Sequence, residues 1–131
     1  MTPVEQPTRT VSVLIVDDQL PFRAVARTVV DHTPGFAVAG EAESGEAAVD
    51  AVDGAPVDLV LMDINLPGIN GIEAARRIRA AHPDTAVILL STYSQADLPA
   101  DASSCGALAY VHKEDFGPAI IRRLWDERPA T

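Results

Sequence analysis

Two hydrophobic patterns alternate along the chain after residue 10. The first is a short, nearly continuous run rich in Val, Ile and Leu, which is typical of a strand buried on both faces of a sheet. Five such runs occur: Val11–Val16, Phe36–Ala39, Val57–Met62, Ala86–Leu90 and Leu108–Val111. Their lengths, and the lack of regular alternation with polar residues, predict five strands of a parallel sheet.

The segments between these runs have the spacing of amphipathic helices, with apolar residues three and four positions apart. The clear apolar stripes are Phe22–Val30, Ala48–Val52, Ile72–Ile78 and Phe116–Leu124. A further segment, Asp97–Cys105, has the weakest helical pattern because it is short and contains Pro99. Pro83 follows one predicted helix, and Ser44 is placed to cap another. Alternating strands and helices predict an α/β domain whose parallel sheet is covered by helices on both faces.

Composition and charge narrow the class of protein. The chain has 131 residues, enough for one domain, which we expect over residues 11–128 between a disordered lead-in (1–10) and a short tail (129–131). A net charge of -9 argues against binding to nucleic acid or to an anionic membrane. The single cysteine excludes an internal disulfide, and no apolar run approaches the roughly 20 residues that span a bilayer. We therefore expect a cytoplasmic protein.

Ionisable or hydroxyl side chains follow four of the five predicted strands. Asp17 and Asp18 follow the first strand and Asp63 follows the third. Ser91 follows the fourth strand and Lys113 lies just after the fifth. Because open α/β sheets bind ligands at the carboxyl ends of their strands, we expect these side chains to share one edge. The second strand brings Gly40 and Glu41 to the same edge, and the sequence assigns them no role.

Three carboxylates at one edge repel one another, so one must take up a proton or a cation must neutralise them. An all-oxygen cluster without His or Cys suits a hard cation such as Mg²⁺. Lys113 would add a compact positive charge suited to a phosphoryl oxygen, and Ser91 would add a hydroxyl. Phosphoryl transfer requires these groups, and a carboxylate can itself accept the phosphoryl group. The pattern therefore indicates phosphoryl-transfer chemistry.

Four stretches stand out when the strand ends are taken in order. They are Val13–Asp18, Leu61–Gly68 followed by Gly71, Leu89–Ser91 and Ala109–Lys113. Together they resemble the receiver domain of bacterial two-component response regulators over about residues 11–127. The resemblance implies a flavodoxin-like fold, a doubly wound five-stranded parallel sheet in the order 2-1-3-4-5.

The resemblance also implies roles at the acidic cluster. Asp63 resembles the phosphoacceptor, which takes a phosphoryl group from the phosphohistidine of a sensor histidine kinase or phosphotransfer protein. Asp17 and Asp18 resemble the acidic pair that holds Mg²⁺, with Asp18 as a direct ligand and Asp17 acting partly through water. Asn65 resembles the position whose backbone carbonyl completes the metal shell. A receiver catalyses only its own phosphorylation and dephosphorylation, so we expect no separate enzymatic activity.

Further positions resemble the parts of a receiver that transmit the signal. Ser91 resembles the switch hydroxyl, Tyr110 the switch aromatic residue that follows it inward, and Lys113 the lysine that contacts the phosphoryl oxygens. Glu114 stands after Lys113 where many receivers have proline, which is more like receivers of the LuxR and NarL type. In the family, the face made by the fourth helix (here 97–105), the fifth strand and the fifth helix forms a homodimer or receives a partner.

Other interpretations stay open from the sequence. Asp17 and Asp18 are of a type that caps helices, Ser91 could bond its own backbone, and Tyr110 could be ordinary packing. A phosphohydrolase of the haloacid dehalogenase type would need an acid where this chain has Asn65. A flavin carrier would need a loop rich in Ser, Thr and Gly after the first strand. A receiver that docks a partner without phosphorylation is a further alternative.

Several other polar or aromatic residues are assigned structural roles. His32 and His82 lie at helix ends, where they can interact with the last carbonyl groups. Trp125 is expected in the core or at its rim. A solvated helix face is expected for Arg76, Arg77 and Arg79.

Overall fold

The computed structural model describes residues 10–92, 102 and 104–129, and strands and helices alternate as expected from β1 to β4. The strands are β1 (Val11–Val16), β2 (Phe36–Ala42), β3 (Leu59–Asp63), β4 (Ala86–Ser91) and β5 (Ala109–His112). The helices are α1 (Leu20–Asp31), α2 (Gly45–Gly54), α3 (Gly71–Ala81) and α4 (Pro118–Asp126). A 3₁₀ turn (Lys113–Asp115) follows β5.

All five strands pair in parallel in the order β2-β1-β3-β4-β5, which confirms the predicted doubly wound sheet. The chain passes from β1 to β2 on one side and then crosses back to β3 on the other. The strand order therefore reverses between β1 and β3. In sheets of this kind the ligand site lies outside the carboxyl ends of the strands at such a reversal.

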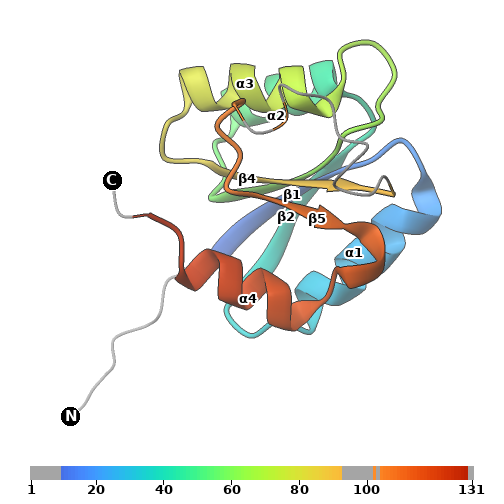
Figure 1. Cartoon of the computed structure of the whole chain (residues 1–131), viewed down its shortest axis with the longest axis vertical. Coiled ribbons are helices and arrows are strands. Elements are labelled where there is room, and N and C mark those ends of the chain that lie inside the picture. Colours follow the sequence, from blue (N-terminus) through green and yellow to red (C-terminus); the bar gives the residue numbers. More distant parts are fainter. Residues whose placement is uncertain (1–9, 93–101, 103, 130–131) are drawn as a thin grey trace.

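Helices cover both faces of the sheet, with α2 and α3 on one side and α1 and α4 on the other (Figure 1). Met62 and Leu89 are buried in the hydrophobic cluster under α2 and α3. Leu61 and Ile121 are buried in the cluster under α1 and α4. Successive residues of a central strand therefore enter opposite clusters, which explains why the central strands are apolar at nearly every position.

The edge strand β2 differs from its prediction. The apolar run ends at Ala39, but the strand continues through Gly40 and Glu41 to Ala42. β2 pairs with β1 alone, and its residues alternate between buried and more exposed positions. A polar residue near its end is compatible with this pairing, so the expectation that every run is buried on both faces is wrong for β2.

Two other boundaries move by two residues. β3 starts at Leu59 because the preceding Asp58 uses its carboxylate to accept hydrogen bonds from Ser12 N–H (2.9 Å) and Ser12 Oγ (3.1 Å). The last helix begins at Pro118 because the chain first forms the 3₁₀ turn. The Ser44 cap is confirmed, since its side chain accepts a hydrogen bond from the backbone N–H of Ala47 (3.1 Å).

Three expectations fall on residues that the structure largely leaves undescribed. The helix expected at Asp97–Cys105 lies mostly outside the described residues, as do the lead-in (1–10) and most of the tail (129–131). Among the helices that are described, none has the length and apolar character needed to cross a membrane.

Candidate functional site

The carboxyl ends of the strands bring the predicted side chains to one edge of the sheet. Asp17 and Ser91 are each 1% exposed, and Asp63 is 4% exposed. Asp18 is exposed to solvent beside them. Lys113, at the start of the turn after β5, extends its side chain back toward the first and third strands. The strand-end pattern therefore corresponds to a real cluster of side chains.

The acidic side chains of this cluster lie close enough to share one cation. Asp17, Asp18 and Asp63 each offer a carboxylate oxygen, and these oxygens all lie within 4.8 Å of one another. Two of the carboxylates are buried and the third is exposed, so a cation could enter from the solvent side. The donor set is entirely oxygen, which fits Mg²⁺ and does not fit a soft metal.

Lys113, the only lysine of the chain, supplies the positive charge at this edge. Its Nζ lies 2.7 Å from Asp17 Oδ2 and 3.5 Å from Asp63 Oδ1. The same ammonium group lies 4.3 Å from the centroid of the Phe22 ring, and Phe22 packs against Phe116 with ring centroids 5.9 Å apart. The lysine is thus held between two carboxylates and an aromatic face. Phe22 was predicted only as part of an apolar stripe.

The environment of Asp63 perturbs its carboxyl group. Burial, with a smaller contribution from the negative charge of Asp17, raises the pKa of Asp63 from 3.8 to about 6. The charge of Lys113 and a hydrogen bond from the backbone of Asn65 act in the opposite direction and keep the rise smaller. Binding of a cation would stabilise the charged form of this carboxylate, because the cation offsets both the cost of burial and the repulsion from Asp17.

The turn between β1 and α1 holds Asp17 in place. The N-cap residue of α1 is Gln19, and no side chain caps this helix. Asp17 Oδ1 accepts a hydrogen bond from Gln19 N–H (2.8 Å), and Asp17 N–H donates one to the Ala42 carbonyl (3.1 Å). The interpretation that Asp17 and Asp18 only cap a helix is therefore wrong: Asp17 braces the turn with one oxygen and binds Lys113 with the other.

The loop after β3 passes very close to the backbone of Asp63. Gly71 N–H donates a hydrogen bond to the Ile64 carbonyl (2.9 Å). A Cβ atom at Gly71 would lie 2.1 Å from the Asp63 carbonyl oxygen, so only glycine fits there. Asn65 is exposed in this loop, two residues after Asp63. Glu46 of α2 braces the loop by accepting a hydrogen bond from Ile69 N–H (3.1 Å).

Ser91 and Tyr110 lie on adjacent strands and on the same face of the sheet. Ser91 pairs with His112, and Leu89 pairs with Tyr110. Because side chains two residues apart on a strand share a face, Ser91 lies on the face of Leu89, and Tyr110 packs against the same cluster. This placement is compatible with the predicted coupling of the two residues.

His32 and His82 both make contacts within the protein, but only one of them makes the contact expected of it. His32 Nδ1 contacts the Thr28 carbonyl at the end of α1 (2.8 Å), as expected, but the expectation is wrong for the His82 side chain, whose Nε2 contacts Asp53 Oδ1 of α2 (2.7 Å) and not a helix carbonyl. Within the described part of the chain, the one group of potential metal ligands consists of the three aspartates.

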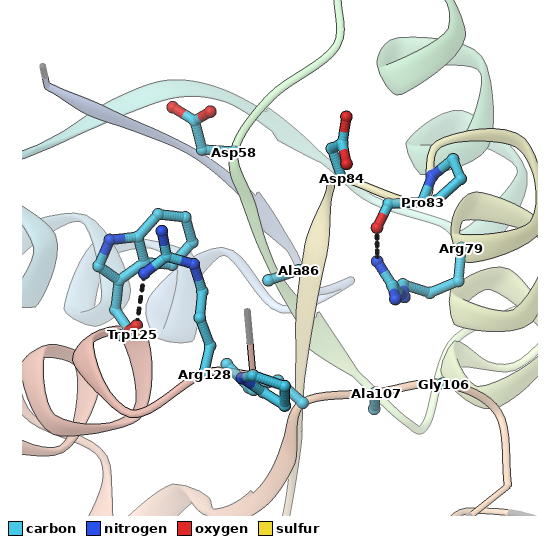
Figure 2. Close-up of a pocket in the computed structure, with 11 residues that line it drawn as sticks. Asp58, Arg79, Pro83, Asp84, Ala86, Gly106, Ala107, Trp125 and Arg128 are labelled. Atoms are coloured by element: carbon cyan, nitrogen blue, oxygen red, sulfur yellow. Dashed lines mark hydrogen bonds between the residues drawn. The ribbon is translucent and has the colours of Figure 1, made fainter. Parts of the chain in front are cut away.

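A hollow of about 490 Å³ lies at the opposite, amino-terminal edge of the sheet (Figure 2). Its basic side chains are engaged with the chain itself. Arg79 donates hydrogen bonds to the carbonyl groups of Pro83 and Thr85, and the Arg128 guanidinium lies 3.7 Å from the centroid of the Trp125 ring. Its lining includes none of the predicted site residues. The hollow is therefore separate from the acidic cluster.

The arginines of α3 differ from one another. Arg76 and Arg77 are exposed and pair with Glu73, as a solvated helix face predicts. Arg79 is half-buried, because its guanidinium turns toward the loop after the helix. The expected solvated face is therefore wrong for Arg79.

Comparisons with known proteins agree with this geometry. Residues 13–124 match the family model of the response regulator receiver domain. The response regulator UvrY of Escherichia coli (strain K12) is 40% identical over 103 residues, which are 79% of this chain and 47% of that protein. A LuxR-family response regulator from an Aurantimonas species has a TM-score of 0.79 at 31% identity, covering 91% of this chain and 88% of that one. The receiver domain of the putative response regulator NarL from Mycobacterium tuberculosis has a TM-score of 0.82 at 26% identity, covering 90% and 95% of the two chains.

The chain therefore belongs to the family of response regulator receiver domains. Its similarity to the LuxR and NarL type is confirmed by the relatives found. These matches are response regulators and their receiver domains, so they do not favour the phosphohydrolase and flavin-carrier alternatives. The chain spans about half the length of the curated relatives that it matches.

Proposed function

We propose that this chain is a phosphorylation-controlled receiver whose acceptor is Asp63 and whose phosphoryl donor is the phosphohistidine of a sensor histidine kinase or phosphotransfer protein. The observation that carries the proposal is the position of the Asp63 carboxylate. It is buried, has a raised pKa, and lies among two further aspartates and the only lysine of the chain. The receiver unit covers residues 11–128, and it acts in the cytoplasm.

The transfer step forms one bond and breaks one. An oxygen of the deprotonated Asp63 carboxylate attacks the phosphorus of the phosphohistidine. The new O–P bond forms as the P–N bond breaks, and the released histidine nitrogen takes up a proton. Ser91 and Lys113 contact the transferred phosphoryl oxygens, where a hydroxyl and an ammonium group form charge-assisted hydrogen bonds.

The acidic cluster is the place for Mg²⁺ in this proposal. Asp17, Asp18 and Asp63 would hold the ion with their carboxylate oxygens, and Asn65 with its backbone carbonyl. When bound, Mg²⁺ would neutralise the negative charge of the transferring group. The residues of the chain orient the acceptor: the loop through Gly71 fixes the backbone of Asp63, and Lys113 contacts its carboxylate.

The output passes to another protein surface in this proposal. The net charge of -9 opposes binding of this unit to nucleic acid. The face that includes β5 and α4, together with the segment 97–105, is the proposed homodimer or partner surface.

Phosphorylation with a small donor tests the assignment. The protein is incubated with acetyl phosphate and MgCl₂, and its intact mass is measured before and after treatment with base. We expect one base-labile phosphoryl group on the wild type and on Asp31→Asn, which removes an exposed carboxylate at the end of α1. We expect none on Asp63→Asn. Labelling of Asp63→Asn equal to that of the wild type would remove Asp63 as the acceptor, and no labelling of any variant would favour the docking alternative.

A further inference from the structure

A buried arginine of α1 connects the acidic site to the edge strand of the sheet. Arg23 is 8% exposed, and its Nη1 donates a hydrogen bond to the Asp17 carbonyl oxygen (2.7 Å). Its Nε donates to Glu41 Oε1 (3.0 Å). Arg23 shares the buried face of α1 with Ala26 and Val30, three and seven residues further along. A buried guanidinium in this position needs a specific reason, because removing its charge from water is costly and an apolar residue could fill the same space, whereas its partner Glu41 stays exposed.

Glu41 is the acidic residue that the sequence brings to the site edge without a role. It lies near the end of β2, outside the acidic cluster, and it binds two arginines of α1 at once. The hydrogen bond from Arg27, with contributions from Arg23, holds the pKa of Glu41 below its usual value against the opposing effect of burial. Glu41 is therefore a fixed anchor for the Arg23 guanidinium.

These contacts fix the backbone of Asp17 from both sides. Its N–H donates to the Ala42 carbonyl at the end of β2 (3.1 Å), and its C=O accepts from Arg23. Both contacts lead to β2, one directly and the other through Glu41. The β1–α1 turn that carries Asp17 and Asp18 is thus tied to the edge strand at two points. A planar guanidinium can make both of its contacts simultaneously, which a lysine ammonium cannot do with the same geometry.

We infer that Arg23, anchored by Glu41, is a positioning residue for the divalent-cation site. It acts through the Asp17 backbone and holds the carboxylates of Asp17 and Asp18 in the orientation that a cation requires. The inference rests on the proposed function, since it concerns the ion that phosphoryl transfer would use. Groups that orient metal ligands through a second contact typically change metal affinity by about 10–100-fold when they are removed.

Two arginines of α1 provide a matched pair of variants. Arg23 and Arg27 both bind Glu41 and both carry one positive charge, but only Arg23 contacts Asp17. Mg²⁺ affinity is measured with MgCl₂ alone by isothermal titration calorimetry on the whole chain, with melting temperature recorded in parallel. We expect Arg23→Gln to weaken Mg²⁺ binding by about tenfold or more. We expect Arg27→Gln to change it by less than about twofold, because Arg27 is exposed and its charge is screened. Arg23→Lys keeps the charge but loses the planar guanidinium that makes both contacts, so its Mg²⁺ binding should also be weaker than that of the wild type.

The outcomes separate positioning from charge and from stability. Equal changes in Arg23→Gln and Arg27→Gln, or complete recovery in Arg23→Lys, would overturn the inference. If Arg23→Gln does not fold, Glu41→Gln replaces it, since this variant removes the anchor and leaves Arg23 present. Weaker Mg²⁺ binding in Glu41→Gln than in Glu43→Gln, which removes the same charge from an exposed position two residues further along, then supports the inference, and equal binding overturns it. Failure of the proposed function is distinct, because the wild type itself would then show no Mg²⁺ binding or no acetyl phosphate labelling.

Discussion

Lys113 and Asp17 form the ion pair that closes the site edge of the sheet, with Nζ 2.7 Å from Oδ2 although 96 positions separate them in the chain. β1 and β5 are not neighbours, since β3 and β4 lie between them. The lysine side chain therefore bridges the width of the site, and it lies nearer to Asp17 than to Asp63. A divalent cation that uses Asp17 must compete with this ammonium group for the same carboxylate.

This competition predicts that removing the lysine strengthens binding of Mg²⁺. In Lys113→Met, the carboxylates lose their internal cation, so the affinity should rise about fivefold, which corresponds to ~1 kcal/mol. The titration is performed at pH 8, above the pKa of Asp63, so that protons do not occupy the site. Arg123→Met is the control, because it removes one positive charge from an exposed position of α4. An unchanged or lower affinity in Lys113→Met alone would show that the lysine does not compete with the ion.

The raised pKa of Asp63 predicts a pH-dependent cost to stability. A carboxyl group with a pKa of about 6 in the folded protein and 3.8 unfolded binds its proton more tightly when folded. Between these values the folded state keeps a proton that the unfolded chain releases, so the free energy of unfolding falls as pH rises through this window. Asp63→Asn lacks this cost, and without Mg²⁺ it should be more stable than the wild type by about 1–3 kcal/mol at pH 8.

Urea unfolding of both proteins at pH 4 and pH 8 measures this difference. The advantage of Asp63→Asn should nearly disappear at pH 4, where Asp63 is protonated in the folded wild type. Addition of MgCl₂ at pH 8 should also reduce it, because only the wild type retains all three carboxylates. A stability difference that is the same at both pH values would contradict the raised pKa.

The sequence predicts the site well because strand ends define it. Five apolar runs and the residues after them suffice to bring Asp17, Asp63 and Lys113 together, since parallel strands share a carboxyl edge. The role of Arg23 is different. Its position on the stripe of Ala26 and Val30 is the only sequence signal. Its partner Glu41 lies on a part of β2 that the apolar run does not include. Burial of a charge can be predicted only when its partner is known.

The close approach of Gly71 to Asp63 predicts a severe effect of a single methyl group. A Cβ there meets the Asp63 carbonyl oxygen at 2.1 Å and its carbon at 2.8 Å, both of them backbone atoms that cannot move aside independently. Gly71→Ala should therefore lose about 2–3 kcal/mol of stability, and its acetyl phosphate labelling should slow because the acceptor strand shifts.

Gly54→Ala serves as the matched control for this prediction. Nothing lies within 4 Å of a Cβ at Gly54, the last residue of α2. This variant should be neutral or more stable by up to about 1 kcal/mol, since alanine favours a helix over glycine. Chemical denaturation and labelling rates check both variants. Equal behaviour of the two would show that the backbone at Gly71 relaxes without affecting the acceptor.

The last prediction concerns how the signal leaves the acceptor. Ser91 is buried at the end of β4, on the face that also carries Tyr110 of β5. A phosphoryl group on Asp63 adds acceptor oxygens that can form hydrogen bonds with the Ser91 hydroxyl. Movement of this hydroxyl toward the phosphoryl group would open space next to Tyr110. The phosphoryl group can shift the balance between the resting and the displaced position of Ser91 only if it interacts differently with the two, and such coupling is typically about 1–3 kcal/mol.

Ser91→Ala should therefore accept the phosphoryl group but lose most of the response at β5 and α4. NMR chemical shifts of these elements are compared with and without beryllofluoride and MgCl₂, which together imitate the phosphorylated state. Thr92→Ala is the control, because it removes the neighbouring hydroxyl from an exposed position. The wild type and Thr92→Ala should show large shifts at Tyr110 and along α4, and Ser91→Ala only small ones. A full response in Ser91→Ala would mean that the signal reaches Tyr110 by contacts other than this hydroxyl.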